Sequence, residues 1–321
     1  MRWKIGGAGV AGSYLYGRMK ESGFNVEIFD PKRSNFYIPC GFATNKNQIK
    51  PYLRRLSIGF EEICEVESDK IWISGHNFEK TEFKQNGLCT INKMKMEEMM
   101  RNNEPYQHGT IRGNGEPVID CTGISRAYLG KVPDDLTMFA IEKVCSSSPF
   151  EGFYFDFFKN GNGYFWSFPL NGRYHIGAGG IDLMEVRSRL SPYEGDRTLS
   201  RRIRMKPLIG NETNQNVIGV GESIGYISPL LGEGIIPALE NAEIFFKIIN
   251  NIDDMNEIKI KYRQAINRRM ENFRAISTMV LNIQSGKTIT LSNLLAVPTA
   301  LNELKGFGIK PVFSKILRHF L

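Results

Sequence analysis

A glycine-rich turn close to the amino terminus constrains the fold more than any other feature of the sequence. A short apolar stretch ends at Ile5, and Gly7, Gly9 and Gly12 follow it in the spacing G-x-G-x-x-G. In a dinucleotide site the first glycine allows a tight turn, the second lets a pyrophosphate approach the backbone, and the third lets a helix pack on the strand. The spacing therefore predicts a strand, a phosphate-binding loop and the start of a helix.

The residues after this turn support that interpretation. Residues 13–22 have helical character, and Gly23 can end the helix. Residues 26–30 form an apolar stretch that closes on Asp30. An acidic residue about 20 positions after the glycines can accept hydrogen bonds from ribose hydroxyls. A nucleotide-binding unit is expected, and the alternative is a glycine-rich turn with an incidental surface Asp30.

Two later segments complete this unit. Residues 117–123 indicate a buried strand that runs into a glycine turn, and residues 216–222 indicate a strand that ends in Glu222. A loop follows, and a long helix begins at Gly234-Ile235. The acid can bind a polyol hydroxyl, and the helix N-terminus can stabilise negative charge on a reduced flavin ring. One acid for a ribose and a second for a ribitol indicate FAD rather than NAD.

Between these segments the chain is rich in aromatic residues. Three such runs, at 153–158, 164–168 and 173–176, are separated by turns of glycine and asparagine, which predicts an antiparallel sheet. Residues 60–91 alternate as short antiparallel strands do, and two charged stretches within 182–206 suggest helices.

The expected fold class is α/β, with three parts. Residues 1–130 and 207–250 form a Rossmann-like FAD-binding domain, residues 131–206 form an inserted antiparallel-sheet substrate domain, and residues 251–321 form a helical C-terminal region.

Composition narrows the class of protein. The chain has 321 residues and a net charge of +7, which favours anionic partners. No nucleic-acid-binding motif accompanies that charge, so nucleic acid is not an expected partner. The five cysteines and four histidines lack the spacing of metal ligands, so no metal is expected. No run is apolar enough to cross a bilayer. The first strand begins almost at Met1, which predicts a cytoplasmic protein without a signal peptide.

The basic amphipathic segment 309–321 suits peripheral contact with a membrane, and it equally suits docking on the protein's own core.

One aromatic run carries a more specific pattern. Residues 164–169 read Y-F-W-S-F-P, and seven residues later comes Gly177-Ala178-Gly179. This fits the signature Y-x-W-x-F-P-x(7)-G-x-G, and together with Pro39-Cys40-Gly41 it resembles the geranylgeranyl reductase family of FAD-dependent, para-hydroxybenzoate-hydroxylase-like flavoproteins. Two positions depart from the family pattern: Glu222 replaces an aspartate, and Lys93 replaces an arginine.

The resemblance implies reduction of isolated double bonds in an isoprenoid or related apolar substrate, with FAD as cofactor and an unknown electron donor. It implies that Cys40 is catalytic, acting as or positioning a proton donor near the flavin ring. The residues expected to hold FAD are Gly7, Gly9, Val10, Ala11, Gly12, Asp30, Pro31, Lys32, Cys40, Gly41, Lys93, Thr122, Gly123, Gly221, Glu222, Pro229, Gly232, Glu233, Gly234 and Ile235. The residues expected near the substrate are Tyr164, Trp166, Phe168, Pro169, Gly177 and Gly179.

Strand alternation places Tyr164, Trp166 and Phe168 on one sheet face and Phe165 on the other. Two alternatives stay open. A flavin-dependent monooxygenase of an aromatic substrate would share the FAD motifs, and a non-catalytic flavin- or lipid-binding protein would share the fold without turnover.

Overall fold

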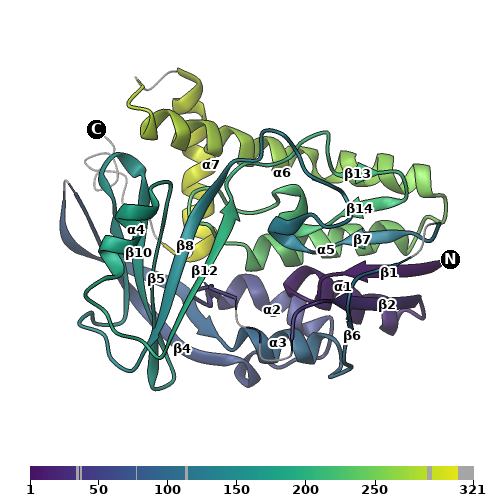
Figure 1. The fold of residues 1–321 in the computed structure, drawn as a ribbon, viewed down its shortest axis with the longest axis horizontal. Coiled ribbons are helices and arrows are strands. Elements are labelled where there is room, and N and C mark those ends of the chain that lie inside the picture. Colours follow the sequence, from purple (N-terminus) through teal and green to yellow (C-terminus); the bar gives the residue numbers. More distant parts are fainter. Residues whose placement is uncertain (34–35, 37, 77, 113–114, 288–290, 310–321) are drawn as a thin grey trace.

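Two β-sheets stand side by side in the protein, and helices join them (Figure 1). The computed structural model describes residues 1–33, 36, 38–76, 78–112, 115–287 and 291–309. The first sheet has six strands in the order β13-β14-β7-β1-β2-β6. Their bounds are β1 Arg2–Gly6, β2 Asn25–Asp30, β6 Gln107–His108, β7 Val118–Asp120, β13 Thr213–Asn214 and β14 Val217–Gly219.

Strand β1 lies inside this sheet, with β2 on one side and β7 on the other, and both neighbours run parallel to it. The chain therefore goes first to one side of β1 and later to the other. In open parallel sheets such a reversal of strand order leaves a crevice at the carboxyl ends of the strands, where ligands bind. The glycine turn follows β1 at this point, as the sequence predicts.

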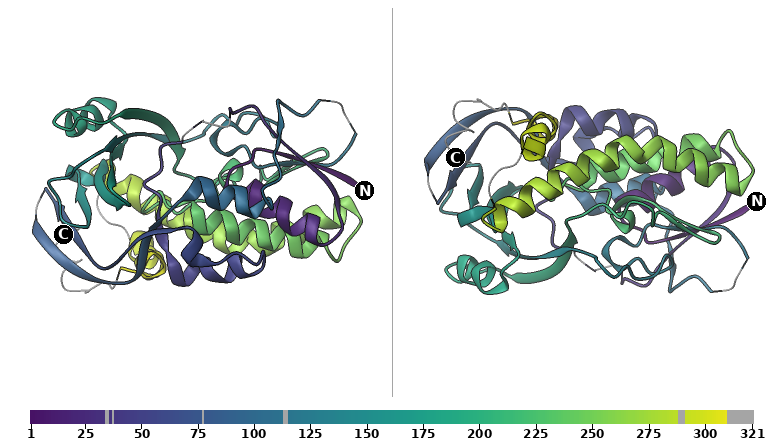
Figure 2. Two further views of the ribbon diagram at one scale, coloured as in Figure 1. Left: turned by 90° about the horizontal axis from the view of Figure 1, so that it is seen from below. Right: turned by 90° about the horizontal axis from the view of Figure 1, so that it is seen from above.

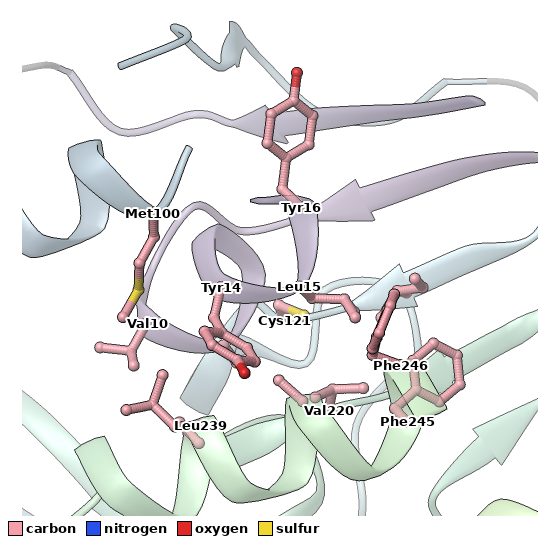
Figure 3. Close-up of a cluster of buried hydrophobic side chains, with 14 of the residues drawn as sticks. Val10, Tyr14, Leu15, Tyr16, Met100, Cys121, Val220, Leu239, Phe245 and Phe246 are labelled. Atoms are coloured by element: carbon pink, nitrogen blue, oxygen red, sulfur yellow. The ribbon is translucent and has the colours of Figure 1, made fainter. Parts of the chain in front are cut away.

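Helix α1 (Val10–Glu21) packs on helix α5 (Ile235–Ile249) and forms the core of this half of the molecule. Figure 3 shows Val10 and Tyr14 directed toward Leu239 of α5, whereas Tyr16 points away from it. The buried Tyr14 hydroxyl donates a hydrogen bond of 2.7 Å to the carboxylate of Glu243. An N-terminal helix is thereby fixed to one that begins more than two hundred residues later.

The second sheet has eight strands in the order β12-β8-β11-β10-β9-β4-β5-β3. Their bounds are β3 Ala43–Asn45, β4 Cys64–Gly75, β5 Phe78–Ile91, β8 Thr137–Cys145, β9 Phe153–Phe157, β10 Gly163–Leu170, β11 Arg173–Gly180 and β12 Arg197–Arg204. Neighbouring strands are antiparallel except for the parallel pair β4 and β9. Strands β3, β4 and β5 belong to this sheet although they precede the 131–206 range expected to form it.

Two helices are expected within 182–206, and the prediction of the second one is wrong. Helix α4 (Leu183–Leu190) is present, but Arg197–Arg204 is strand β12 and pairs antiparallel with β8. Strand β12 lies at the edge of the sheet, and Arg197 and Arg202 are exposed there. Arg204 is buried and pairs with Asp135, and Arg201 pairs with Glu222. The sequence pattern alone resembles an exposed helix face.

The remaining helices cover and connect the sheets. They are α2 (Lys46–Arg54), α3 (Lys93–Met100), α6 (Met255–Gln284) and α7 (Leu291–Phe307). Helix α6 runs along the molecule from one sheet to the other (Figures 1 and 2). Arg263 near its start bonds to Thr213 of β13 at 2.6 Å, and Gln284 at its end bonds to the carbonyl of Gly161, beside β10, at 2.8 Å.

Among the described helices, none combines the length and the apolar character that crossing a membrane requires. The segment 309–321, for which membrane contact is one expectation, lies outside the described residues apart from Ile309.

Candidate cofactor and active site

The three glycines of the first turn differ in what surrounds them. A Cβ on Gly7 would lie 2.4 Å from the carbonyl oxygen of Cys121, and Gly7 has a φ of +96°. A Cβ on Gly12 would lie 1.9 Å from the carbonyl oxygen of Gly7. The nearest atom to a Cβ on Gly9 is 3.9 Å away, on the carboxylate of Glu97. Gly7 and Gly12 are therefore required by close backbone packing, whereas Gly9 leaves space at the backbone surface.

The first N–H groups of α1 have no side-chain cap and can bind an anion. Helices α2, α3, α4 and α6 each begin at a side chain that accepts N–H bonds of the first turn, namely Asn45, Asn92, Asp182 and Asp254. Helix α1 follows Gly9 without such a cap, and no acidic residue occupies its first turn. The N–H groups at this end, including those of Val10 and Ala11, are the ones a helix leaves for an external acceptor.

Asp30 closes β2 beside this loop. One of its carboxylate oxygens accepts the N–H of Ala8 at 2.7 Å, and the other accepts the N–H of Lys32 at 2.8 Å, across the exposed Pro31. The Lys32 ammonium lies 3.6 Å from the same carboxylate. A carboxylate has about four acceptor sites, so Asp30 positions the glycine loop and keeps capacity for ribose hydroxyls.

The turn after β7 is organised by Asp120, which is fully buried. Its carboxylate accepts the N–H groups of Thr122 at 3.0 Å, Tyr128 at 2.9 Å and Leu129 at 3.0 Å. This brings Gly123 against the carboxylate of Glu222, which would lie 3.2 Å from a Cβ on Gly123. Two segments that the sequence predicts to meet at the cofactor therefore do lie together.

Glu222 pairs with a residue that the sequence reasoning missed. Its carboxylate forms an ion pair with Arg201 of β12, with 2.5 Å between Nη2 and Oε2, and also accepts the backbone N–H of Arg204 at 3.2 Å. Gly221, with a φ of +77°, donates its N–H to the side chain of Asn241 at 2.7 Å. The acid expected to bind a ribitol is thus ion-paired with the arginine-rich edge strand β12.

The loop before α5 folds back on itself. Its only proline, Pro229, is buried, and the N–H of Gly232 donates to Ser228 at 2.9 Å. Helix α5 begins after Gly234 at Ile235, as the sequence predicts. Glu233 accepts the N–H of Ile236 at 2.9 Å, and burial raises the pKa of its carboxyl to about 7.

The aromatic signature has a direct explanation in strand pairing. Trp166 lies opposite Gly177 and Tyr164 lies opposite Gly179 across β10 and β11. A Cβ on Gly177 would lie 2.1 Å from the ring of Trp166, so the glycine makes room for the indole. Phe165 packs in a different cluster from Trp166, which confirms the predicted alternation.

Two loops contact this aromatic face. A Cβ on Gly41 would lie 2.5 Å from the ring of Phe168, and one on Gly232 would lie 2.9 Å from the hydroxyl of Tyr164. The same hydroxyl donates to the carbonyl of Leu231. Cys40-Gly41 and the loop before α5 therefore meet the face formed by Tyr164, Trp166 and Phe168.

Pro169 falls at the alternate register position from this face, and its carbonyl accepts the Thr90 hydroxyl at 2.7 Å.

Charges surround the Cys40 thiol. Burial raises its pKa, while the positive charges of Lys93 and Arg201 act in the opposite direction and Glu142 adds to the rise. The Lys93 ammonium pairs with Glu97 at 2.6 Å on α3. Lys93 thus lies where the family resemblance expects a basic residue, and its partner Glu97 was missed.

Two further residues that the sequence reasoning missed are Glu142 and His175, both fully buried. The backbone N–H of Cys40 donates to Glu142 at 3.4 Å, and His175 Nδ1 lies 3.1 Å from the carbonyl oxygen of Cys40. Burial raises the pKa of Glu142 to about 8 and lowers that of His175 to about 4. A lone acid at an inward position of an apolar strand is the signal that could have identified Glu142.

A cavity of about 320 Å³ opens beside the loop that precedes α5. It lies among α2, α5 and α7, and its lining includes polar residues together with Leu231 and Phe307. Leu231 and Phe307 also belong to the apolar cluster of Trp166 and Phe168, so the cavity adjoins the aromatic face.

No profile of a known protein family matches the chain. A protein of Methanocaldococcus jannaschii, named uncharacterized protein MJ1182, is 27% identical, and the match covers 82% of this chain and 87% of the relative.

Solved structures resemble the fold over almost all of its length. A geranylgeranyl bacteriochlorophyll reductase-like protein from Thermoplasma acidophilum has a TM-score of 0.72 and 14% identity, covering 95% of this chain and 98% of the other. A triple mutant of the flavin-dependent brominase Bmp2 has a TM-score of 0.69 and 12% identity, covering 99% and 97%. A variant of HpxO from Klebsiella pneumoniae, complexed with FAD, has a TM-score of 0.66 and 13% identity, covering 96% and 98%.

The chain therefore has the α/β fold that these solved structures share, and the fold expected from its motifs is confirmed.

Proposed function

We propose that the chain is an FAD-dependent oxidoreductase that reduces isolated double bonds of a geranylgeranyl-type isoprenoid. The observation that carries the proposal is the contact of Cys40-Gly41 with the aromatic face of Tyr164, Trp166 and Phe168, next to Lys93, Arg201 and Glu222. This contact supports a site that combines an apolar wall, a thiol and polar groups for a cofactor.

The residues present fit FAD. The uncapped start of α1 and the open space at Gly9 suit a pyrophosphate, and Asp30 suits a ribose. Glu222 stands where a ribitol acceptor is expected, with Arg201 as its partner in the described structure. If FAD is held by these residues, its reduced form would provide the hydride that a double-bond reduction needs.

The chain's own contribution is a proton and an apolar enclosure. Burial raises the pKa of Cys40, which keeps the thiol protonated and able to give its proton to the second carbon of the double bond. The nearby positive charges of Lys93 and Arg201 then stabilise the thiolate that is left. The aromatic wall excludes water and can stabilise positive charge on a substrate carbon through its ring faces.

The test is anaerobic. Protein loaded with FAD is reduced chemically, geranylgeranyl lipids are added, and hydrogenated products are sought by mass spectrometry. We expect products two mass units heavier per reduced bond in the wild type, and a large loss of turnover in Cys40→Ala. Wild-type turnover in that variant would contradict the role of Cys40. FAD-loaded protein that forms no product across chain lengths would contradict the reductase.

A second candidate is a flavin-dependent monooxygenase of a small aromatic substrate. The observation in its favour is the cavity of about 320 Å³ beside the aromatic face, which is at the lower end of ligand-pocket volumes and has a partly polar lining. Oxygen uptake coupled to NADPH oxidation would favour it over the reductase. Binding of flavin and lipid without either reaction would favour a non-catalytic binding protein.

A further inference from the structure

Side chains from two neighbouring strands of the eight-stranded sheet contact the backbone of Cys40. Its N–H donates to Glu142 of β8 at 3.4 Å, and His175 Nδ1 of β11 lies 3.1 Å from its carbonyl oxygen. The two side chains also face one another, with 3.5 Å between His175 Nδ1 and Glu142 Oε1. Both are fully buried, and a polar side chain is costly to bury unless it is hydrogen-bonded.

Strand register explains how they reach the same peptide. Glu142 lies opposite Gly177 on β11, and His175 is two residues before that glycine on the same face. Gly177 in turn lies opposite Trp166, whose indole occupies the space that a Cβ on Gly177 would need. Trp166 lies close to Glu142 and acts to lower the pKa of its carboxyl, but the indole Nε1 and Glu142 Oε2 are both buried without a hydrogen-bond partner in the described structure. Glu142 is therefore hydrogen-bonded to the Cys40 segment and lies beside the aromatic wall without a hydrogen bond to it.

We propose that Glu142 and His175 are positioning residues that clamp the Cys40-Gly41 peptide and so set where the Cys40 thiol stands over the aromatic wall. The proposal rests on the proposed function for its meaning in catalysis. The clamp itself is a property of this chain that can be measured without turnover. Burial holds Glu142 neutral near pH 7, with a pKa of about 8, and His175 neutral, with a pKa of about 4, so the clamp carries no net charge there.

The experiment measures alkylation of Cys40 by iodoacetamide in the full chain loaded with FAD, by peptide mass spectrometry. Cys64 is the other partly buried cysteine and serves as an internal reference. Glu142→Leu and His175→Leu remove the acceptor and the ring nitrogen, and each is expected to raise the Cys40/Cys64 rate ratio about five- to tenfold. The matched control is Val144→Ala, because Val144 is buried opposite His175 in the same pair of strands.

Variants that keep a hydrogen-bonding group test whether Glu142 and His175 act by positioning the Cys40 peptide or only by filling space. Glu142→Gln keeps an acceptor for the Cys40 N–H, and His175→Asn keeps a donor, so both are expected to restore the wild-type ratio near pH 7. Above about pH 8 the wild-type Glu142 ionises and opposes thiolate formation, whereas glutamine does not. Alkylation of Cys40 in Glu142→Gln should therefore rise at lower pH than in the wild type.

The other groups that act on the site are unchanged by this substitution. They are Lys93 of α3, Arg201 of β12, Tyr164 of β10 and His175 of β11.

A ratio in both leucine variants equal to that of Val144→Ala would overturn the clamp. If those variants do not fold, His175→Phe replaces them, because phenylalanine keeps a ring but has no nitrogen; a Cys40/Cys64 ratio in His175→Phe equal to that in His175→Asn would overturn the clamp. Wild-type protein that shows the clamp but forms no hydrogenated lipid would contradict the proposed function and leave the clamp standing.

Discussion

Substitution of two glycines in the first turn separates phosphate binding from folding. Gly9 has ordinary dihedral angles, with φ at −81°, and a Cβ there meets no atom closer than 3.9 Å. Gly9→Ala is therefore expected to leave the stability of the FAD-free protein unchanged. The new methyl group occupies the surface to which a pyrophosphate must approach. We expect the Kd for FAD to rise at least about tenfold, which corresponds to about 1.4 kcal/mol.

Gly12→Ala acts on the fold instead. Its Cβ would lie 1.9 Å from the carbonyl oxygen of Gly7, which is a backbone atom that cannot move alone. Such overpacking costs about 1 to 3 kcal/mol or more, while alanine in a helix returns at most about 1 kcal/mol. With about 2.1 cal/mol/K of unfolding entropy per residue over 321 residues, a net loss of about 1 to 2 kcal/mol lowers the Tm by about 1.5 to 3 °C.

The assay pairs thermal unfolding of the FAD-free proteins with titration of FAD followed by flavin fluorescence. The wild type and both variants are measured under one buffer condition. A Gly9→Ala protein that binds FAD as the wild type does would refute the placement of the pyrophosphate. A Gly12→Ala protein as stable as Gly9→Ala would refute the packing argument.

Two further results are expected. Gly177→Ala should displace the indole of Trp166, because the new Cβ would lie 2.1 Å from its ring. The matched control is Gly179→Ala, where the atom nearest to the new Cβ would be 3.4 Å away. Tryptophan fluorescence and thermal unfolding distinguish the two variants. Glu142 binds a proton more tightly in the folded protein, with a pKa of about 8 against an ordinary 4.5, so it makes stability fall as pH rises between those values. Glu142→Gln should flatten the Tm profile over that interval, and an unchanged slope would contradict the buried neutral acid.

The sequence predicted those parts of the fold that local signals specify. The glycine spacing at Gly7, Gly9 and Gly12 determines a turn within a few residues, and the strand, loop and helix appear where expected. The aromatic run from Tyr164 to Phe168 alternates with period two, and its two faces pack in separate clusters. These features depend on neighbours in sequence, so a pattern suffices to find them.

The features that escaped prediction depend on pairing between distant segments. Strand β12 resembles an exposed helix because its arginines give no sign of their distant partners Glu222 and Asp135, and only its pairing with β8 identifies it as a strand. Strands β3, β4 and β5 join the second sheet through the parallel contact of β4 with β9. Glu142 and His175 reach Cys40 only through the register of β8 with β11, which no local spacing specifies.

Helix α6 has a mechanical consequence for the site. Its 30 residues span about 45 Å as a single rod, and hydrogen bonds tie its two ends to the two sheets. Rotating one sheet away from the other would break these ties or bend the rod. Relative movement of the two sheets is therefore coupled to α6. For the proposed reductase we expect substrate exchange to depend on local movements of side chains and loops rather than on separation of the sheets.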